Sequence, residues 1–415
     1  MTDKPILFVT SVDPWTQTHG ALLRQRWILR VLAEFAPVHM VFLDPFDWTV
    51  EAHVVEEHER LEGVHKLVHA SGVRSTLRAG DRIAWLRSGA VPLELVRSLP
   101  PGWLESLRNV LGDQEYGLCW YSRSRSFAAV SPAVSARASV IDIDDVESSK
   151  RRQHVLARFP KGEDLTTRDR LARWQAVRDA RSWEAFERRA AESVDMALVC
   201  HEADAAALGI ANVRVLPNTY PRPRVPLGRS EIGEPPTILM QGSLTYAPNV
   251  DGAQYLVHEV LPRLRRTFPD VRLRLVGRAG DAARRLHDPP RVVVTGYVDA
   301  IEDELQRADI ITVPIRFGGG SRIKIIEALA HRIPVVSTTA GAAGLDVEAE
   351  QHLLLADSAE SFASAIDRAL RDRITRSRLR EQGALYFQER LTTEAGVRRL
   401  RGFVGALLER LDGPK

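Results

Sequence analysis

The sequence predicts an α/β protein made of two doubly wound domains. Short apolar runs alternate with helix-period segments over residues 6–216, and the same alternation restarts at residue 237. Between them, six of the twenty residues 217–236 are prolines, which continue neither a helix interior nor a sheet ladder. We therefore expect these parts: a first domain, a linker, a second domain, and a C-terminal helix that packs back on the first domain, over residues 1–220, 221–236, 237–390 and 391–415.

The first domain is expected to begin with a strand at 6–10 and a helix at 21–35, where apolar residues recur at intervals of three and four. Its further strands are expected at residues 38–43, 117–122, 139–143, 196–200 and 213–216. Runs that stay apolar on both faces, such as 6–9 and 196–200, are typical of a parallel sheet that helices cover on both sides.

The second domain repeats this rhythm more clearly. Strands are expected at residues 237–240, 271–276, 291–295, 310–313 and 334–337, and helices at residues 250–268, 301–308, 321–331 and 393–411. Doubly wound sheets bind ligands at the carboxyl ends of their strands, so we expect a ligand cleft between the facing edges of the two sheets.

Composition excludes several classes of protein. The chain has 415 residues, and its 57 Lys and Arg against 54 Asp and Glu leave a net charge of +3, too small to coat a nucleic-acid backbone. No apolar run approaches the ~18 residues of a membrane span, and the apolar start at 6–9 is too short for a signal peptide. Cys119 and Cys200 are far apart, which favours two buried thiols in a cytoplasmic protein.

A glycine-rich loop at 317–321 opens the helix predicted at 321–331. Three consecutive glycines allow the backbone to approach a ligand and to point its N–H groups at an anion. Arg322 and Lys324 then fall in the first helical turn, where the helix dipole disfavours positive charge. Such a breach of a local rule is typical of a binding site. No complete G-x-G-x-x-G fingerprint occurs, which disfavours a nicotinamide or flavin oxidoreductase.

Two segments of the second half carry a family resemblance. Residues 242–252 read GSLTYAPNVDG, and residues 314–328 read PIRFGGGSRIKIIEA. These segments resemble the donor-binding domain of family 4 glycosyltransferases, in the branch with a G-G-G-[ST]-R-x-K-x-x-E element. The resemblance covers most of residues 237–346 and is weaker in the first half, where it rests on residues 9–23, 202–208 and 217–218.

This resemblance implies the GT-B fold, two Rossmann-like domains facing a cleft, with a nucleotide-sugar donor held mainly by the second. It implies that Glu327 accepts hydrogen bonds from the ribose hydroxyls. Most of the family has another glutamate eight residues earlier, where this chain has Gly319, and the usual Arg and Lys pair is replaced by Ser243 and Leu244. The donor-binding residues so implied are Gly20, Gly242, Ser243, Gly319, Gly320, Ser321, Arg322, Lys324 and Glu327.

The run Asp142-Ile143-Asp144-Asp145 ends a predicted strand of the first domain. One interpretation is a D-x-D site for Mg²⁺ or Mn²⁺; another is a helix N-cap aspartate. The family comparison instead aligns Asp144, or Asp145, with a histidine that lies beside the donor sugar, where a carboxylate would hold a sugar hydroxyl or act as a base. The catalytic candidates are therefore Asp144, Asp145 and His19, and no metal is assigned. His19 is either a loop residue at the cleft or a plain exposed histidine.

Residues 150–192 carry 12 Lys or Arg against seven Asp or Glu, with aromatic residues interleaved. This stretch fits an amphipathic segment that contacts anionic lipid at the inner face of the membrane. More often, such a run is one long helix with a solvated basic face.

We therefore expect a glycosyltransferase that transfers a sugar from a nucleoside diphosphate to an unidentified saccharide, lipid-linked or small-molecule acceptor held by the first domain. By resemblance, the reaction retains anomeric configuration and requires no metal or other cofactor, and no nucleic acid takes part. Two alternatives stay open: a non-catalytic nucleotide- or partner-binding module, which the missing glutamate permits, and a nucleotide-sugar epimerase.

Overall fold

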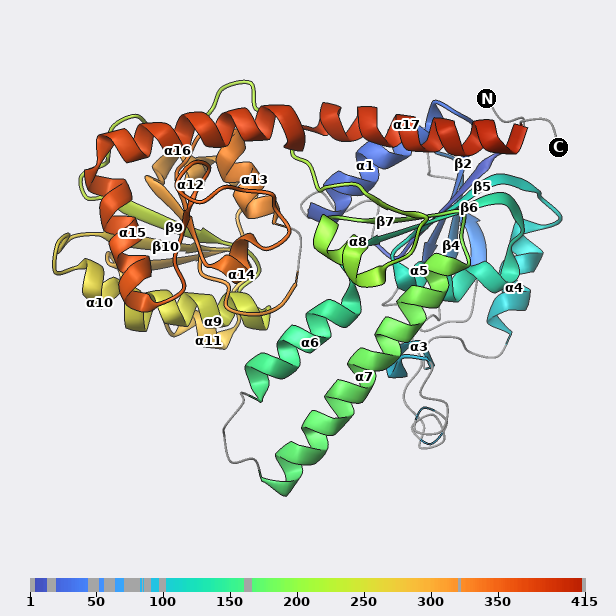
Figure 1. Ribbon diagram of the computed structural model, residues 1–415, viewed down its shortest axis with the longest axis horizontal. Helices are drawn as coiled ribbons and strands as arrows, with labels where there is room; N and C mark the ends of the chain where they lie inside the picture. Colours follow the sequence, from blue (N-terminus) through green and yellow to red (C-terminus); the bar gives the residue numbers. More distant parts are fainter. Residues whose placement is uncertain are drawn as a thin grey trace. The chain divides into compact units, whose positions relative to one another are not determined.

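The computed structural model describes residues 4–12, 20–43, 52–55, 64–70, 83, 85, 91–96, 102–159, 166–319 and 322–412. It divides into two compact units (Figure 1). The first contains residues 1–217 and 396–415, with residues 319–321 grouped there as well, and the second contains residues 218–318 and 322–395. The proline-rich stretch after residue 217 thus belongs to the second unit.

The first unit is built on an eight-stranded sheet, counted over the described residues, with the order β3-β4-β2-β1-β5-β6-β7-β8. Its strands are β1 (Ile6–Thr10), β2 (Val38–Leu43), β3 (Ala52–Val55), β4 (Val64–Ala70), β5 (Tyr116–Ser122), β6 (Ala136–Asp144), β7 (Met196–Val199) and β8 (Val213–Val215). All neighbours pair in parallel except β3, which pairs antiparallel with β4 at the edge. We did not predict this antiparallel edge, because a four-residue strand leaves little pattern to read.

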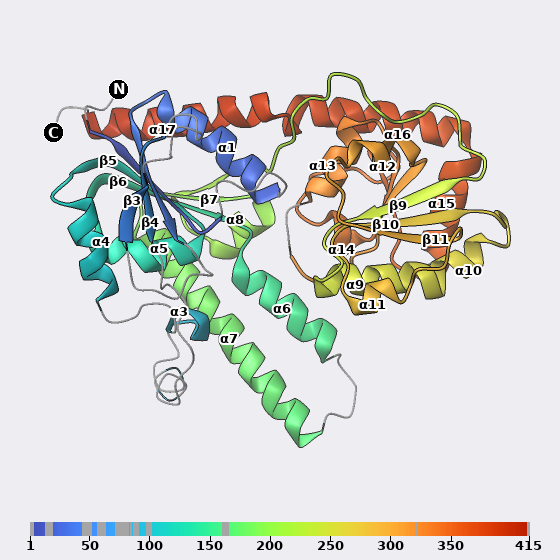
Figure 2. The same ribbon diagram turned by 180° about the vertical axis from the view of Figure 1, so that it is seen from behind.

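Helices lie along both faces of this sheet (Figures 1 and 2). They are α1 (Gly20–Ala33), α3 (Leu93–Val96), α4 (Trp103–Leu111), α5 (Ser124–Val130), the 3₁₀ turn η1 (Ser131–Ala133), α6 (Glu147–Arg158), α7 (Thr167–Glu192) and α8 (Glu202–Leu208). The basic stretch 150–192 is therefore not one long helix. It forms most of α6 and α7, which lie side by side and project beyond the sheet.

The second unit has a six-stranded parallel sheet, counted over the described residues, in the order β11-β10-β9-β12-β13-β14. Its strands are β9 (Thr237–Gln241), β10 (Arg272–Val276), β11 (Val292–Gly296), β12 (Ile310–Val313), β13 (Val335–Ser337) and β14 (Leu354–Leu355). Its helices are α9 (Ala247–Tyr255), η2 (Leu256–Val260), α10 (Leu261–Leu264), α11 (Asp281–Arg284), α12 (Glu302–Arg307), α13 (Ile323–Ala330), α14 (Thr339–Ala342), α15 (Ala359–Arg371), α16 (Arg373–Tyr386) and η3 (Phe387–Leu391).

Two helices of this unit differ from their predicted form. The helix expected at 250–268 begins at Ala247 and contains a π-helical turn, η2, before it ends at Leu264. The helix expected at 321–331 begins only at Ile323, so Arg322 occupies its N-cap position. The predicted class, two doubly wound α/β domains, is confirmed.

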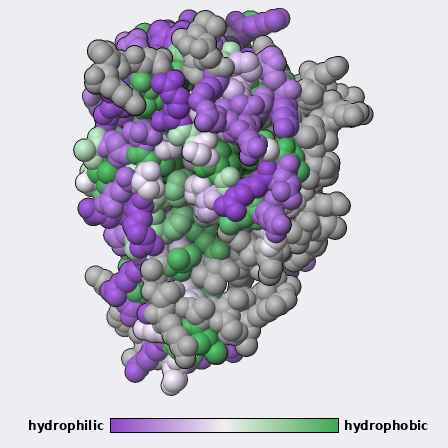
Figure 3. Space-filling model, turned by 90° about the vertical axis from the view of Figure 1, so that its right-hand side faces the viewer, coloured by the Kyte–Doolittle hydropathy of each residue, from purple (hydrophilic) through white to green (hydrophobic). Residues whose placement is uncertain are grey.

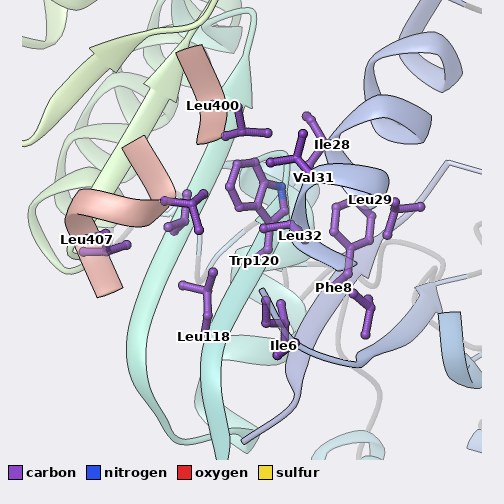
Figure 4. Packing of buried hydrophobic residues seen from close by; sticks show 14 of the residues in the cluster. Ile6, Phe8, Ile28, Leu29, Val31, Leu32, Leu118, Trp120, Leu400 and Leu407 are labelled. Carbon is purple, nitrogen blue, oxygen red and sulfur yellow. The ribbon is translucent and has the colours of Figure 1, made fainter. Parts of the chain in front are cut away.

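The last helix, α17 (Thr393–Asp412), contributes to the core of the first unit from residue 396 onward. Leu400, Val404 and Leu407 are buried with Trp120 and Leu32 in one apolar cluster (Figure 4). A bidentate ion pair joins α17 to Glu34, the residue that follows α1, with Arg401 Nε and Nη2 at 2.7 and 2.8 Å from the Glu34 carboxylate oxygens.

No helix of the described residues is both long enough and apolar enough to cross a membrane. The side of the protein drawn in Figure 3 shows hydrophobic residues in several separate groups among hydrophilic ones.

The strand orders also locate the expected ligand sites. In the first sheet the order reverses between β1 and β5, and in the second between β9 and β12. Loops that leave neighbouring strands at such a point diverge to opposite faces, which opens a crevice at the carboxyl ends. The loops after β9 and β12 contain residues 242–246 and 314–319, which belong to the two segments singled out from the sequence.

The packing of α17 predicts that truncating Leu400, which is fully buried, destabilises the first unit. We expect Leu400→Ala to lower the free energy of unfolding by about 2–5 kcal/mol through the cavity it leaves. Tryptophan fluorescence in urea measures this selectively, because all eight tryptophans lie within residues 1–217. Arg399→Ala, an exposed change on the same helix, is the matched control, and equal midpoints for the two variants would contradict the prediction.

Candidate functional site

Two glycines bring the ends of β9 and β10 together in the second unit. Gly242 and Gly277 follow these strands with φ values of 137° and 136°. A Cβ atom on Gly277 would lie 2.1 Å from the carbonyl oxygen of Gly242, and one on Gly242 would lie 2.9 Å from Asn249 Nδ2 and 3.1 Å from Lys324 Nζ. No larger residue fits at either position without displacing backbone or these polar groups.

Lys324 lies in the first turn of α13 and directs its ammonium toward this glycine corner. Its Nζ donates to Asn249 Oδ1 at 2.9 Å, and Asn249 Nδ2 donates to the carbonyl oxygen of Ser243 at 2.9 Å. Burial, and secondly the charge of Arg322, lower the pKa of Lys324 to about 8. The amide that Lys324 contacts is neutral, so this hydrogen bond leaves the positive charge uncompensated.

Arg322 does not share this position. Its guanidinium donates to two backbone carbonyl oxygens, from Nε to Ala343 and from Nη2 to Ala340, each at 2.9 Å. The expectation that two cations oppose the helix dipole is therefore wrong for Arg322, which precedes the helix and is held by carbonyl oxygens. Of the two cations, only Lys324 lies in the first turn of α13, where its charge opposes the helix dipole.

Glu327 lies one turn beyond Lys324 on the same helix and is 8% exposed. Gln241 Nε2 donates to its Oε2 at 2.6 Å, and the hydroxyl of Tyr220 hydrogen-bonds to the same carboxylate. Burial raises the pKa of Glu327, against the lowering effect of these two hydrogen bonds. A carboxylate accepts about four hydrogen bonds, so two acceptor positions are left for a ligand.

The glycine loop is described in part. Gly318 has a φ of 89°, and a Cβ there would lie 2.7 Å from Pro248 Cγ. Gly320 and Ser321 lie outside the described residues, as does His19, and Gly319 is grouped with the first unit. Gly20 is the first residue of α1. The second unit thus brings Gly242, Ser243, Lys324 and Glu327 together.

In the first unit, a buried ion pair stands at the end of β6. Arg24 of α1 binds both oxygens of Asp142, from Nε at 2.9 Å and from Nη2 at 2.7 Å, and both side chains are 3% exposed. Its Nη1 also donates to the carbonyl oxygen of Leu216 at 2.9 Å. Both oxygens of Asp142 thus bind a buried guanidinium, which would compete with a metal ion for them and argues against the D-x-D metal interpretation. Arg24 was missed because nothing in the pattern of α1 marks it.

Asp144 ends β6 with a φ of 62°, an unusual value for a non-glycine residue. Its Oδ1 accepts from the Cys200 thiol at 2.7 Å, and its Oδ2 lies 3.3 Å from Arg123 Nη2. Burial alone would raise the pKa of Asp144, but the charges of Arg24 and Arg123 outweigh it, and the pKa falls to about 2. The carboxylate is therefore ionised at neutral pH.

The N-cap interpretation of Asp144 is wrong. The helix that follows, α6, has Val146 at its N-cap, and its first amide groups donate to another helix instead. The N–H groups of Glu147 and Ser148 lie 2.7 and 3.1 Å from the carboxylate oxygens of Glu187 on α7.

Asp145 pairs with Lys150 at 3.5 Å. Ligand atoms of Asp144, Asp145 and Cys200 lie within 4.8 Å of one another, the spacing of a metal site. However, Asp144 already has Arg24 and Arg123 nearby, and Asp145 has Lys150. Positive side chains in these positions compete with a cation for the same oxygens.

The Arg24–Asp142 pair predicts a large loss of stability when one partner is removed. We expect Asp142→Asn to lower the free energy of unfolding of the first unit by about 3–5 kcal/mol, because it removes the ionised, bidentate partner of a buried guanidinium. The double variant Arg24→Met with Asp142→Leu should recover much of this loss. Urea unfolding followed by tryptophan fluorescence measures both, and additive losses in the double variant would count against the pair.

Comparisons with known proteins agree with this geometry. Residues 235–372 match the family model described as Glycosyl transferases group 1. No curated protein sequence matches the chain significantly.

Several solved structures align over nearly the whole chain. Sucrose-phosphate synthase from Thermosynechococcus elongatus aligns with a TM-score of 0.67 and 18% identity, over 98% of this chain and 100% of that one. HepE from Anabaena, in complex with UDP-glucose, aligns with a TM-score of 0.63 and 15% identity, over 97% of this chain and 99% of that one. TarM aligns with a TM-score of 0.63 and 10% identity, over 98% of this chain and 99% of that one. The chain therefore has the GT-B fold, and the match of its second unit to glycosyl transferases group 1 supports a glycosyltransferase.

Proposed function

We propose that the chain is a metal-independent, retaining hexosyltransferase of family 4, acting in the cytoplasm. It transfers a sugar from a nucleoside diphosphate held by the second unit to an acceptor held by the first. The observation that carries this proposal is Lys324, a cation at the carboxyl end of β9 whose hydrogen-bond partner, Asn249, is neutral. A diphosphate is the ligand chemistry that such a charge favours.

The arrangement along α13 suits the two ends of a nucleoside diphosphate. The helix N-terminus and Lys324 favour the phosphate groups, and Gly242 leaves room for them to approach the backbone. Glu327, one turn further, offers its two remaining acceptor positions to the ribose hydroxyls. HepE binds UDP-glucose, so a uridine diphosphate sugar is the first donor to test.

In the proposed reaction, the acceptor hydroxyl attacks the anomeric carbon on the face from which the diphosphate departs. The bond from the sugar to the diphosphate breaks, and a diphosphate oxygen takes the proton from the acceptor. Lys324 stabilises the negative charge that develops on this leaving group. Asp144 is a weak base at a pKa of about 2, so we assign it to holding a sugar hydroxyl rather than to removing a proton.

The donor site predicts distinct effects for its two charged residues. Lys324→Met should weaken binding of a nucleoside diphosphate about 10- to 150-fold and leave the free nucleoside unchanged, because only the phosphates meet the ammonium. Glu327→Gln should weaken both, because both carry the ribose. Calorimetric titration with UDP, GDP, ADP and their nucleosides measures these constants. Arg272→Met, an exposed change at the amino end of β10, is the matched control.

Four outcomes would contradict the proposal. If none of the three diphosphates binds, or if both variants bind them as the wild type does, the donor site is misplaced. If nucleotide sugars bind but none is transferred to any acceptor extract, the chain is a non-catalytic module. Interconversion of the free nucleotide sugar without transfer would indicate an epimerase.

We further propose that the distal parts of α6 and α7 contact an anionic lipid surface. Leu156, Leu171 and Trp174 are 56%, 57% and 49% exposed there. The same two helices carry five exposed arginines, of which Arg152 pairs with Glu184: Arg152, Arg158, Arg168, Arg170 and Arg173. Apolar side chains set among cations match a bilayer interface with anionic headgroups, and an acceptor carried by a lipid would lie at such a surface.

This lipid contact predicts binding to vesicles that contain about 30% phosphatidylglycerol but not to pure phosphatidylcholine vesicles, with release at high salt. Cosedimentation measures it. The double variant Leu171→Ala with Trp174→Ala should lose most of the binding, whereas Leu385→Ala, an exposed leucine of α16, should not. Equal recovery with both vesicle types, or no effect of the double variant, would refute the proposal.

A further inference from the structure

Tyr220 lies in the proline-rich segment and has its backbone bound at both polar groups. Its N–H donates to the carbonyl oxygen of Leu391 at 2.9 Å, and its carbonyl oxygen accepts from the N–H of Thr393 at 3.1 Å. These two bonds form an isolated parallel bridge between Tyr220 and Thr392. The side chain is buried, with 8% of the residue exposed.

This bridge joins the two segments through which the chain passes between its units. The chain leaves the first unit after Pro217 and returns to it at Gly396. Thr392 is also where the helical run ends, because its extended ψ of 151° separates η3 from α17. Tyr220 therefore has its backbone held where the outgoing and returning segments lie side by side.

The side chain of Tyr220 reaches the candidate donor site from this place. Its hydroxyl hydrogen-bonds to the Glu327 carboxylate. Its ring packs edge-on against His331, at the end of α13, with centroids 6.0 Å apart and ring planes at 68°. Glu327 is thus held by two donors from separate elements, Gln241 of β9 and Tyr220.

We propose that Tyr220 is a positioning residue that holds the Glu327 carboxylate in place for the ribose hydroxyls of the donor. This inference rests on the proposed function, in which Glu327 binds the ribose. A glutamate side chain has three rotatable bonds, and one hydrogen bond leaves it free to turn about that contact. A second donor from another direction removes this freedom, so the ligand need not supply the ordering cost on binding.

The same hydrogen bond also favours the ionised form of Glu327. The groups that face this carboxylate are Tyr220, Gln241 and, at longer range, Glu302 of α12. Burial and the negative charge of Glu302 raise the pKa of Glu327, whereas the two hydrogen bonds lower it. Removing the Tyr220 hydroxyl therefore raises this pKa further, and the acceptor form of the carboxylate is lost at a higher pH on acidification.

The test is Tyr220→Phe, which removes only the hydroxyl. Calorimetric titrations with UDP, GDP and ADP should give binding about 3- to 10-fold weaker than the wild type. Titrations with the matching 2′,3′-dideoxy nucleotides should give no change, because these lack the hydroxyls that Glu327 contacts. Tyr255→Phe is the matched control, since Tyr255 is a buried tyrosine of the same unit whose hydroxyl has no hydrogen-bond partner among the described residues.

Two further measurements separate positioning from general loss of structure. In the background of Glu327→Gln, the Tyr220→Phe change should have no additional effect on nucleotide affinity. In the Tyr220→Phe variant alone, affinity should begin to fall at a higher pH than in the wild type as the solution is acidified. An equal loss for ribose and dideoxy nucleotides, or an undiminished effect beside Glu327→Gln, would overturn the inference.

Failure of the inference is distinguishable from failure of the proposed function. If Glu327→Gln weakens nucleotide binding and Tyr220→Phe does not, only the positioning role is refuted. If neither change has an effect, or if no diphosphate binds, the assignment of Glu327 to the ribose is itself wrong, and the role of Tyr220 falls with it.

Discussion

The second unit depends on one close approach of backbone to backbone. Where β9 and β10 end, a side chain on Gly277 would fall 2.1 Å from the carbonyl oxygen of Gly242. Because neither residue has a side chain, the loop after β9 can bend so that Asn249 and Lys324 meet beside Gly242. The position of the cation therefore follows from a steric constraint on two strand ends, and only secondarily from its own helix.

Much of this could be predicted from the sequence. The strands of the second unit have short runs rich in apolar residues, and the loops carry the glycines and charges that a ligand site needs. The start of α13 was placed one to two residues early because Ser321 is a good N-cap type, whereas the structure puts Arg322 at that position. This shift is small along the chain, but it places Arg322 before the first helical turn. Its guanidinium there donates to two backbone carbonyl oxygens.

The partners of the site residues could not be predicted, because they come from distant parts of the chain. Tyr220 and Gln241 precede Glu327 by 107 and 86 residues, and Asn249 precedes Lys324 by 75. Arg24 and Asp142 are 118 residues apart. Hydrophobic periodicity reports which face of an element is buried, but it carries no information on which polar side chain completes a buried pair.

The two buried carboxylates of the candidate sites differ in a way that bears on function. Asp144 has guanidinium groups nearby, and its pKa falls to about 2, so its charge is already compensated within the protein. Glu327 has neutral donors and a raised pKa, and Lys324 on the same helix has a neutral partner and a lowered pKa. Burial thus disfavours the charged form of both α13 residues, whereas neighbouring charges favour that of Asp144.

This difference indicates which of the sites gains most from a ligand. Anionic groups beside Lys324 would raise its pKa toward the ordinary value, and hydroxyl donors beside Glu327 would favour its ionised form. The two side chains are three residues apart on one helix and require opposite partners: acceptors of high negative charge for one and donors for the other. A nucleoside diphosphate carries both, since its phosphates and its ribose hydroxyls lie on opposite sides of the same sugar ring. Burial disfavours the charges of both α13 side chains, and this class of ligand relieves that electrostatic cost at both ends.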